Sequence, residues 1–191
     1  TLAVTDTIAY VGSGKTLRIC DTSDPAAPAV VNTLFFSEDI KEIKIHRGHA
    51  YLRMEGFEGG YLLVMDMSDP VNPVEVTKIA NFVQDIELEG DYAYVIVGYF
   101  SVGTSFPVWD VSNPDDIQFL ASFTTSPRET ETGDNRYRML DLAVKDDAVY
   151  IGWTGYESCT HVECKGGLLI LDVSDKTNPV ELGVDFLGTG I

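Results

Sequence analysis

Basic residues are scarce in this sequence. Thirteen lysines and arginines stand against thirty aspartates and glutamates among 191 residues, which gives a formal net charge of −17. A surface of this charge repels the phosphates of nucleic acids and the headgroups of anionic lipids. No nucleic-acid partner is therefore expected, and a solvated acidic surface is the simplest interpretation of the charge.

Long apolar runs are also missing. No stretch approaches the roughly 18 apolar residues that a membrane-spanning helix requires, so membrane insertion is not expected. No signal peptide is visible. The chain opens at Thr1 rather than at a methionine, which leaves the presence of a leader or of an upstream region open.

A sustained helical period is absent as well. Hydrophobic residues make up 45% of the chain and aromatic residues 10%, which is typical of a globular domain. These residues occur in short runs separated by Gly, Asp, Asn and Pro, the pattern of strands joined by turns. The sequence therefore predicts an all-β protein.

One motif suggests a nucleotide site. Residues 9–16, AYVGSGKT, match the phosphate-binding loop of nucleotide hydrolases. That loop needs a helix after it, whose N-terminal N–H groups hold the phosphates. Pro25 and Pro28 follow too closely to allow a useful helix, and residues around Leu17 and Ile19 alternate as in a strand. We therefore interpret Gly14, Lys15 and Thr16 as part of a hairpin.

A local pattern occurs four times: a short strand that ends in tyrosine, a loop, and an apolar strand that ends in aspartate. The tyrosines are Tyr10, Tyr51, Tyr94 and Tyr150, and the aspartates are Asp21, Asp66, Asp110 and Asp172. Successive aspartates are 45, 44 and 62 residues apart, and each interval has room for four short strands. This period is typical of the blades of a β-propeller.

The predicted fold is an all-β propeller of four-stranded antiparallel blades, with about four blades in this chain. They are expected at approximately 1–38, 39–82, 83–137 and 138–187, within one domain that spans 1–191. In the second blade the strands are expected at 40–45, 50–54, 61–67 and 73–80. Four blades could close on themselves, but part of a larger ring is favoured because a free fourth blade exposes a strand edge.

The turn after each of these aspartates is nearly the same: DTSDPAAP, DMSDPVNP, DVSNPDDI and DVSDKTNP. Asp and Ser in such a turn form hydrogen bonds with nearby backbone. Calcium ligands or catalytic acids are alternative interpretations, but a copy in every repeat favours a structural role.

The strand and turn together, in LLVMDMSDPVNPV, LRICDTSDPAAPA and LLILDVSDKTNPV, resemble the LVIVD repeat. The resemblance implies a β-propeller and an extracellular or cell-surface location. It brings no catalytic motif and no cofactor. The third copy departs from the pattern, with Ile117 in place of the second proline and Phe106-Pro107 at the start of its strand.

The repeats differ in length mainly at one end of the blades. The loops there run through 12–15, 55–60 and 98–105 to 153–167, and the connection before the fourth blade extends over 126–138. Variable loops on a repeated scaffold are typical of a binding platform for a protein or a carbohydrate ligand. The candidate binding residues are Arg128, Arg136, Tyr137, Arg138, Trp153, Tyr156, Glu157 and His161. Alternatively, Trp153 packs against the neighbouring blade and the arginines pair with nearby acids.

The fourth blade also holds two of the three cysteines. Cys159 and Cys164 are expected to form a disulfide, which favours an oxidising compartment, although free thiols and a zinc site with His161 are alternatives. Cys20 is expected to be a buried core thiol.

No nucleophile and base stand at a recognisable spacing. The favoured function is therefore that of a non-enzymatic, exported binding module. Further blades of the same or another chain are also considered as partners. The alternatives are an enzyme whose funnel site needs additional blades and a structural unit of a surface assembly.

The disulfide can be tested directly. Pairing of Cys159 with Cys164 should lower the intact mass by about two hydrogens relative to the reduced protein. Thiol titration after unfolding should then find only Cys20. Three titratable thiols in freshly purified material would contradict the disulfide and weaken the case for export.

Overall fold

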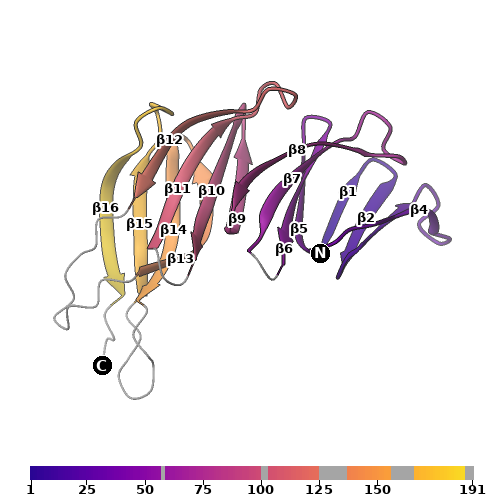
Figure 1. Cartoon of the computed structure of the whole chain (residues 1–191), viewed down its shortest axis with the longest axis horizontal. Coiled ribbons are helices and arrows are strands. Elements are labelled where there is room, and N and C mark those ends of the chain that lie inside the picture. The colour runs from indigo at the N-terminus through magenta and orange to yellow at the C-terminus, as the bar shows by residue number, and fades with distance from the viewer. Residues whose placement is uncertain (57–58, 100–102, 125–136, 156–165, 188–191) are drawn as a thin grey trace, which may run out of the picture. The chain divides into compact units, whose positions relative to one another are not determined.

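The structure, a computed structural model, describes residues 1–56, 59–99, 103–124, 137–155 and 166–187. These residues form sixteen strands in four sheets (Figure 1). The first sheet contains β1 (Leu2–Thr5), β2 (Ile8–Ser13), β3 (Thr16–Asp21) and β4 (Ala29–Phe35). The second contains β5 (Asp39–His46), β6 (His49–Glu55), β7 (Tyr61–Asp66) and β8 (Val74–Asn81). The third contains β9 (Val83–Glu89), β10 (Tyr92–Tyr99), β11 (Gly103–Asp110) and β12 (Gln118–Thr124). The fourth contains β13 (Tyr137–Lys145), β14 (Ala148–Gly155), β15 (Gly166–Asp172) and β16 (Val180–Leu187).

Each sheet has the same topology. Its four strands lie side by side in chain order, and the pairs whose register is defined are antiparallel. The described part of the chain is thus all-β, as predicted, in four-stranded antiparallel sheets. It includes no helix that is long and apolar enough to cross a membrane.

The chain divides into two compact units, residues 1–83 and 84–191. In the first unit, the first and second sheets share a core that includes Tyr10, Leu17, Ile19, Ile40, Ile43, Leu52, Met54, Leu63 and Met65. In the second unit, the third and fourth sheets share a core that includes Tyr94, Ile96, Phe106, Val108, Met139, Leu142, Ile151, Trp153, Leu169 and Leu171. A four-stranded sheet is therefore stabilised within each unit by burying one face against another sheet.

The strands of the second sheet match the expected ranges to within one residue at each end. The third repeat differs from the expectation. Most of the predicted loop 98–105 is strand, because β10 continues to Tyr99 and β11 begins at Gly103. Val97 pairs with Ser105 and Gly98 with Thr104, so ladder hydrogen bonding extends the hairpin into a stretch rich in turn-forming residues.

The GSGKT stretch is a hairpin, as predicted. Ser13 pairs with Thr16, and the two-residue turn between them has Gly14 at φ 54°, a conformation that favours glycine. The carbonyl groups of this turn accept hydrogen bonds from the chain that follows the first sheet: Ile40 N–H donates to Gly14 at 2.8 Å, and Phe36 N–H donates to Lys15 at 2.8 Å. The turn therefore anchors the next sheet, and a strand rather than a helix follows it.

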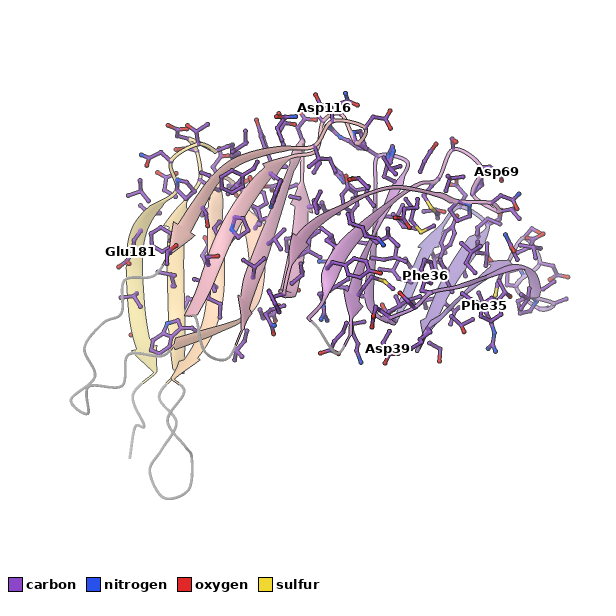
Figure 2. The ribbon with its side chains drawn as sticks, in the orientation of Figure 1. Phe35, Phe36, Asp39, Asp69, Asp116 and Glu181 are labelled. Atoms are coloured by element: carbon purple, nitrogen blue, oxygen red, sulfur yellow. The ribbon has the colours of Figure 1, made fainter. Side chains whose placement is uncertain are left out.

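The turn between the third and fourth strands has the same hydrogen bonds in all four sheets. The backbone N–H groups of Ser23, Ser68, Ser112 and Ser174 each donate to the carboxylate two residues earlier at 2.8 Å. A second side-chain acceptor follows in each turn, at Asp24, Asp69, Asn113 and Asp175. The third turn keeps this geometry despite Ile117. Figure 2 shows Asp69 and Asp116 on two of these turns.

These contacts confirm the structural role predicted for the turn aspartates. In each turn the serine two residues after the aspartate donates hydrogen bonds through its backbone N–H and its hydroxyl. These bonds lower the pKa of four aspartates below the usual 3.8: Asp21, Asp66, Asp110 and Asp172. The ionised carboxylates therefore act as local acceptors that close the turn.

The hairpin interpretation predicts the effect of two substitutions. Lys15 is exposed, whereas Leu17 is 1% exposed in the core. Lys15→Ala should change the unfolding free energy by no more than about 0.5 kcal/mol, whereas Leu17→Ala should cost about 2–4 kcal/mol. Urea denaturation measures both. A melting point raised several degrees by Mg-ATP in wild type but not in Lys15→Ala would instead indicate a phosphate site.

The turn carboxylates predict a dependence of stability on pH. Because the pKa of Asp66 is lower in the folded than in the unfolded state, its contribution is complete above the unfolded value of 3.8 and is lost as the pH falls through the folded value. The unfolding free energy should therefore decrease between about pH 5 and about pH 2. Asp66→Asn keeps an acceptor for Ser68 N–H and should weaken this decrease, while Asp66→Ala should destabilise the protein at neutral pH. An identical pH profile for wild type and Asp66→Asn would contradict the assignment.

Candidate functional site

Two long segments attach to neighbouring positions of the fourth sheet. The connection from β12 enters β13 at Tyr137, and Tyr137 pairs with Gly155, the last residue of β14. Thr154 pairs in turn with Gly166, the first residue of β15. Figure 1 shows these ends of β13, β14 and β15 at one end of the sheet. The register thus joins segments 125–136 and 156–165 to one end of a single sheet.

Trp153 lies in β14, two residues before the end of the strand and thus close to these attachment points. It is 7% exposed, belongs to the core of the second unit and pairs with Met139 and Gly167. A Cβ atom on Gly167 would lie 2.7 Å from the Trp153 ring and closer still to the carbonyl oxygen of Asp185, so only glycine fits between them. Trp153 is therefore part of the core that the third and fourth sheets share, and it exposes little surface to a partner.

The other candidate residues are divided between β13 and the stretches outside the described residues. Tyr137 and Arg138 are the first two residues of β13, where Arg138 pairs with Thr154. Arg128, Arg136, Tyr156, Glu157 and His161 lie outside the described residues, as do Cys159 and Cys164. The binding role of these residues and the disulfide stay predictions.

Cys20 differs from the expectation. It is a free thiol that is only partly buried, not a fully buried core residue. The alternation of β3 explains this, because Leu17 and Ile19 face the second sheet while Arg18 and Cys20 point to the opposite side. No group of three or more His, Cys, Asp or Glu residues suited to a metal ion occurs within the described ranges.

At the opposite end of the second unit, a lysine replaces a proline of the repeated turn. Lys176 occupies the position of Pro70, and its side chain is 14% exposed. The ammonium donates to the carboxylate of Asp147 and, at 2.7 Å, to the carbonyl of Val173. It also lies 5.2 Å from the ring centroid of Tyr92, within the range of a cation–π contact.

Sequence reasoning missed this cluster, although a lysine at a turn position where the other three copies have proline is a visible signal. Burial alone lowers the pKa of the Lys176 amine, but Asp147 and Tyr94 outweigh it and the pKa is raised. The charged form is therefore favoured. Because Tyr92 belongs to the third sheet, Lys176 acts as a contact between the two sheets of this unit rather than as a reactive amine.

The repeated tyrosines are mostly buried. Tyr10, Tyr51 and Tyr94 are each at most 1% exposed, and burial raises the pKa of Tyr51 to about 12. The Tyr10 hydroxyl donates to the carbonyl of Pro70 at 3.0 Å. These tyrosines stay protonated near neutral pH and serve as packing and hydrogen-bonding groups.

Comparisons with solved structures agree with the observed topology. The structure of the N-terminal domain of Nup159 is similar, with a TM-score of 0.67 and 12% sequence identity. A chain in a complex of S. cerevisiae Dbp5 with Nup159 and Gle1 has a TM-score of 0.66 and 13% identity. In both cases the match covers 95% of this chain but 46% of the other, so this chain spans less than half their length.

A hypothetical selenium-binding protein from Sulfolobus tokodaii is also similar, with a TM-score of 0.57, 13% identity, and coverage of 93% of this chain and 48% of the other. At such identities the likeness concerns the fold alone. A search of curated protein sequences found no match.

The family comparison is more specific. The LVIVD repeat matches residues 1–34, 41–81, 82–125 and 162–184, which together exceed half of the chain. The matches fall on all four sheets and include the strand and turn on which the resemblance was based. The four sheets are thus blades of a β-propeller, and the chain belongs to the LVIVD-repeat family.

Proposed function

We propose that this chain is a non-enzymatic, exported or cell-surface propeller module that binds a protein or carbohydrate partner through the loop end of its fourth sheet. The observation that carries the proposal is the pairing of Tyr137 with Gly155 and of Thr154 with Gly166. It brings the attachment points of segments 125–136 and 156–165 together.

The support beneath these segments suits a binding site. Trp153 is fixed in the core, and Gly167 admits no larger residue beside it. Loops that leave a rigid scaffold lose less conformational entropy on binding than loops on a mobile base. Segments joined to such paired strand ends can therefore act as one recognition surface.

The composition of the two segments favours macromolecular recognition. They contribute Arg128, Arg136, Tyr156, Glu157 and His161, and the adjoining start of β13 contributes Tyr137 and Arg138. Arg and Tyr are enriched among residues that dominate binding energies at interfaces. Trp153, being buried, would support the surface rather than contact the partner.

A protein partner is consistent with the similar structures, since one of them records Nup159 together with Dbp5 and Gle1. The setting outside the cell is supported by the family resemblance and by the spacing of Cys159 and Cys164. The acidic composition favours a partner with cationic or neutral polar groups over an anionic one.

Loop exchange tests the proposal. Partners are first captured with wild type by pull-down from a secreted-protein fraction and by a glycan array. A variant in which segments 126–136 and 156–165 are both shortened to the lengths found in the second repeat should lose the captured partner. Arg128→Ala and Tyr156→Ala should each weaken binding by about tenfold or more if they are central to the interface.

The control is a change at the opposite end of the same unit. Asp115→Asn combined with Asp116→Asn alters exposed charge on the turn after β11 and should leave binding unchanged. Equal melting temperatures for wild type and the shortened variant would show that the fold is intact. Undiminished binding by the shortened variant would overturn the proposal.

A further inference from the structure

Histidine is rare in this chain, and two of its three histidines lie opposite each other in the second sheet. His46 is the last residue of β5, and His49 is the first residue of β6. Only Arg47 and Gly48 separate them, with φ 48° and 74°, so the strands reverse in a two-residue turn. Both histidine side chains are partly exposed.

The pairing puts two imidazole rings on one face of the sheet. Residues directly opposite each other in an antiparallel pair have their side chains on the same side, with Cβ atoms about 4.5–5.5 Å apart. Two rings at this separation can reach one ion between them. Imidazole nitrogen is a favoured ligand of Zn²⁺, Cu²⁺ and Ni²⁺. The hairpin therefore presents two ligands of one kind to a single position.

The ring of His49 is held by its own turn. Its Nδ1 atom lies 3.2 Å from the carbonyl oxygen of Arg47. Because a carbonyl oxygen only accepts, this contact assigns the ring proton to Nδ1 and leaves the lone pair on Nε2. Metal-binding histidines are commonly oriented in this way, by donation of their other N–H to a backbone carbonyl. The turn thus fixes the tautomer that a metal ligand needs.

The charges beside the pair have opposite effects on a bound cation. Arg47 in the turn adds a positive charge that opposes it. Asp66 offsets this charge, because it pairs with His49 on the other side and lies close enough for their charges to interact. Its carboxylate already accepts from the backbone N–H and hydroxyl of Ser68 at 2.8 and 3.0 Å. Asp66 therefore supplies a countercharge in the same cross-strand row rather than a third ligand.

The fold does not require histidine at these positions. None of the equivalent pairs in the other sheets contains it: they are Thr5 with Ile8, Glu89 with Tyr92, and Lys145 with Ala148. Each of these pairs flanks a turn of two residues, as His46 and His49 do. Since three unlike pairs close the same turn, two histidines in one pair need another explanation.

We propose that His46 and His49 form an open binding site for one divalent transition-metal ion of the class that imidazole binds, Zn²⁺, Cu²⁺ or Ni²⁺. The two imidazole nitrogens provide half of the ligands of a four-coordinate ion, and water or a group of another molecule completes the set. The site belongs to the first unit, whereas the partner site proposed above belongs to the second. The two proposals are therefore independent.

A phosphate or a carboxylate ligand is a poorer fit to this turn. Arg47 would attract it, but the carboxylate of Asp66 lies in the row of both histidines and would repel it. The net charge of −17 also lowers the local concentration of anions and raises that of cations. The electrostatics therefore favour a metal ion.

Calorimetric titration with ZnCl₂ tests the site in the full chain, purified without a histidine tag. The titration is repeated on the variant Cys159→Ser/His161→Asn/Cys164→Ser, which lacks the alternative zinc ligands of the fourth blade. This variant should still bind one ion. His46→Asn or His49→Asn in the same background should each weaken binding by about tenfold or more, because each removes one of two ligands.

The matched control replaces both histidines by the residues of the first sheet, as His46→Thr/His49→Ile. These residues close the same turn in their own sheet, so the fold should be kept while the metal site is lost. At about one hundred times the measured dissociation constant, Zn²⁺ should raise the melting temperature of the histidine-containing chain by about 5 °C or more. It should leave that of the control unchanged.

Electron paramagnetic resonance of bound Cu²⁺ identifies the ligands directly. Hyperfine coupling to two imidazole nitrogens is expected, and to one after His46→Asn or His49→Asn. These single variants also keep the test decisive if the doubly substituted control does not fold.

Three results would overturn the proposal. The first is equal Zn²⁺ affinity with and without the two histidines. The second is loss of all binding on replacement of Cys159, His161 and Cys164 alone. The third is stabilisation of the chain by inorganic phosphate but not by Zn²⁺, which would assign the turn to an anion instead.

Discussion

The structure depends on one constraint: a four-stranded sheet of this repeat cannot bury its apolar residues by itself. Each sheet has side chains on both faces, and isolated small sheets are marginally stable in water. The tyrosine at the third position of the second strand shows how the need is met. The Tyr10 side chain lies in the core shared with the second sheet, and its hydroxyl donates a hydrogen bond to a turn of that sheet. The contact that buries this side chain therefore also sets the position of the next sheet. Folding and assembly of the blades are therefore the same process.

The two ends of each sheet are stabilised in different ways. The turns between third and fourth strands satisfy their own hydrogen bonds through Asp, Ser and Asn, so their sequence is restricted. The ends that hold segments 125–136 and 156–165 are fixed by strand pairing and by Trp153 below them. Segments attached to such ends can differ in length without changing the core, which is the reason that the proposed recognition residues are sought there.

Much of the fold could be predicted because its determinants are local. Alternation gave the strands, and the repeated Asp and Tyr gave the period. Cys20 could not be placed correctly, because burial of a strand face depends on which neighbouring sheet covers it. The extent of β10 and β11 was also missed, since Gly98 and Ser105 favour turns locally while ladder hydrogen bonds keep them in strands. For the site, the repeat predicted convergence of two loops on one blade, but nothing repeats within those loops to indicate their conformation.

The two blade joints that lie within the units are chemically distinct even though the sheets are alike. One joint uses a tyrosine hydroxyl and the carbonyl of Pro70, and the other uses the Lys176 ammonium beside Tyr92 and Asp147. Repeat proteins are prone to pairing the wrong units, because their modules have similar surfaces. Exchanging the two turns would put a proline where the Lys176 ammonium pairs with Asp147 and contacts Tyr92, whereas the backbone carbonyl that accepts from Tyr10 would remain, because every residue carries one. The side-chain requirement at this turn position therefore differs between the two units, so one member of the repeat is less interchangeable than its sequence similarity implies.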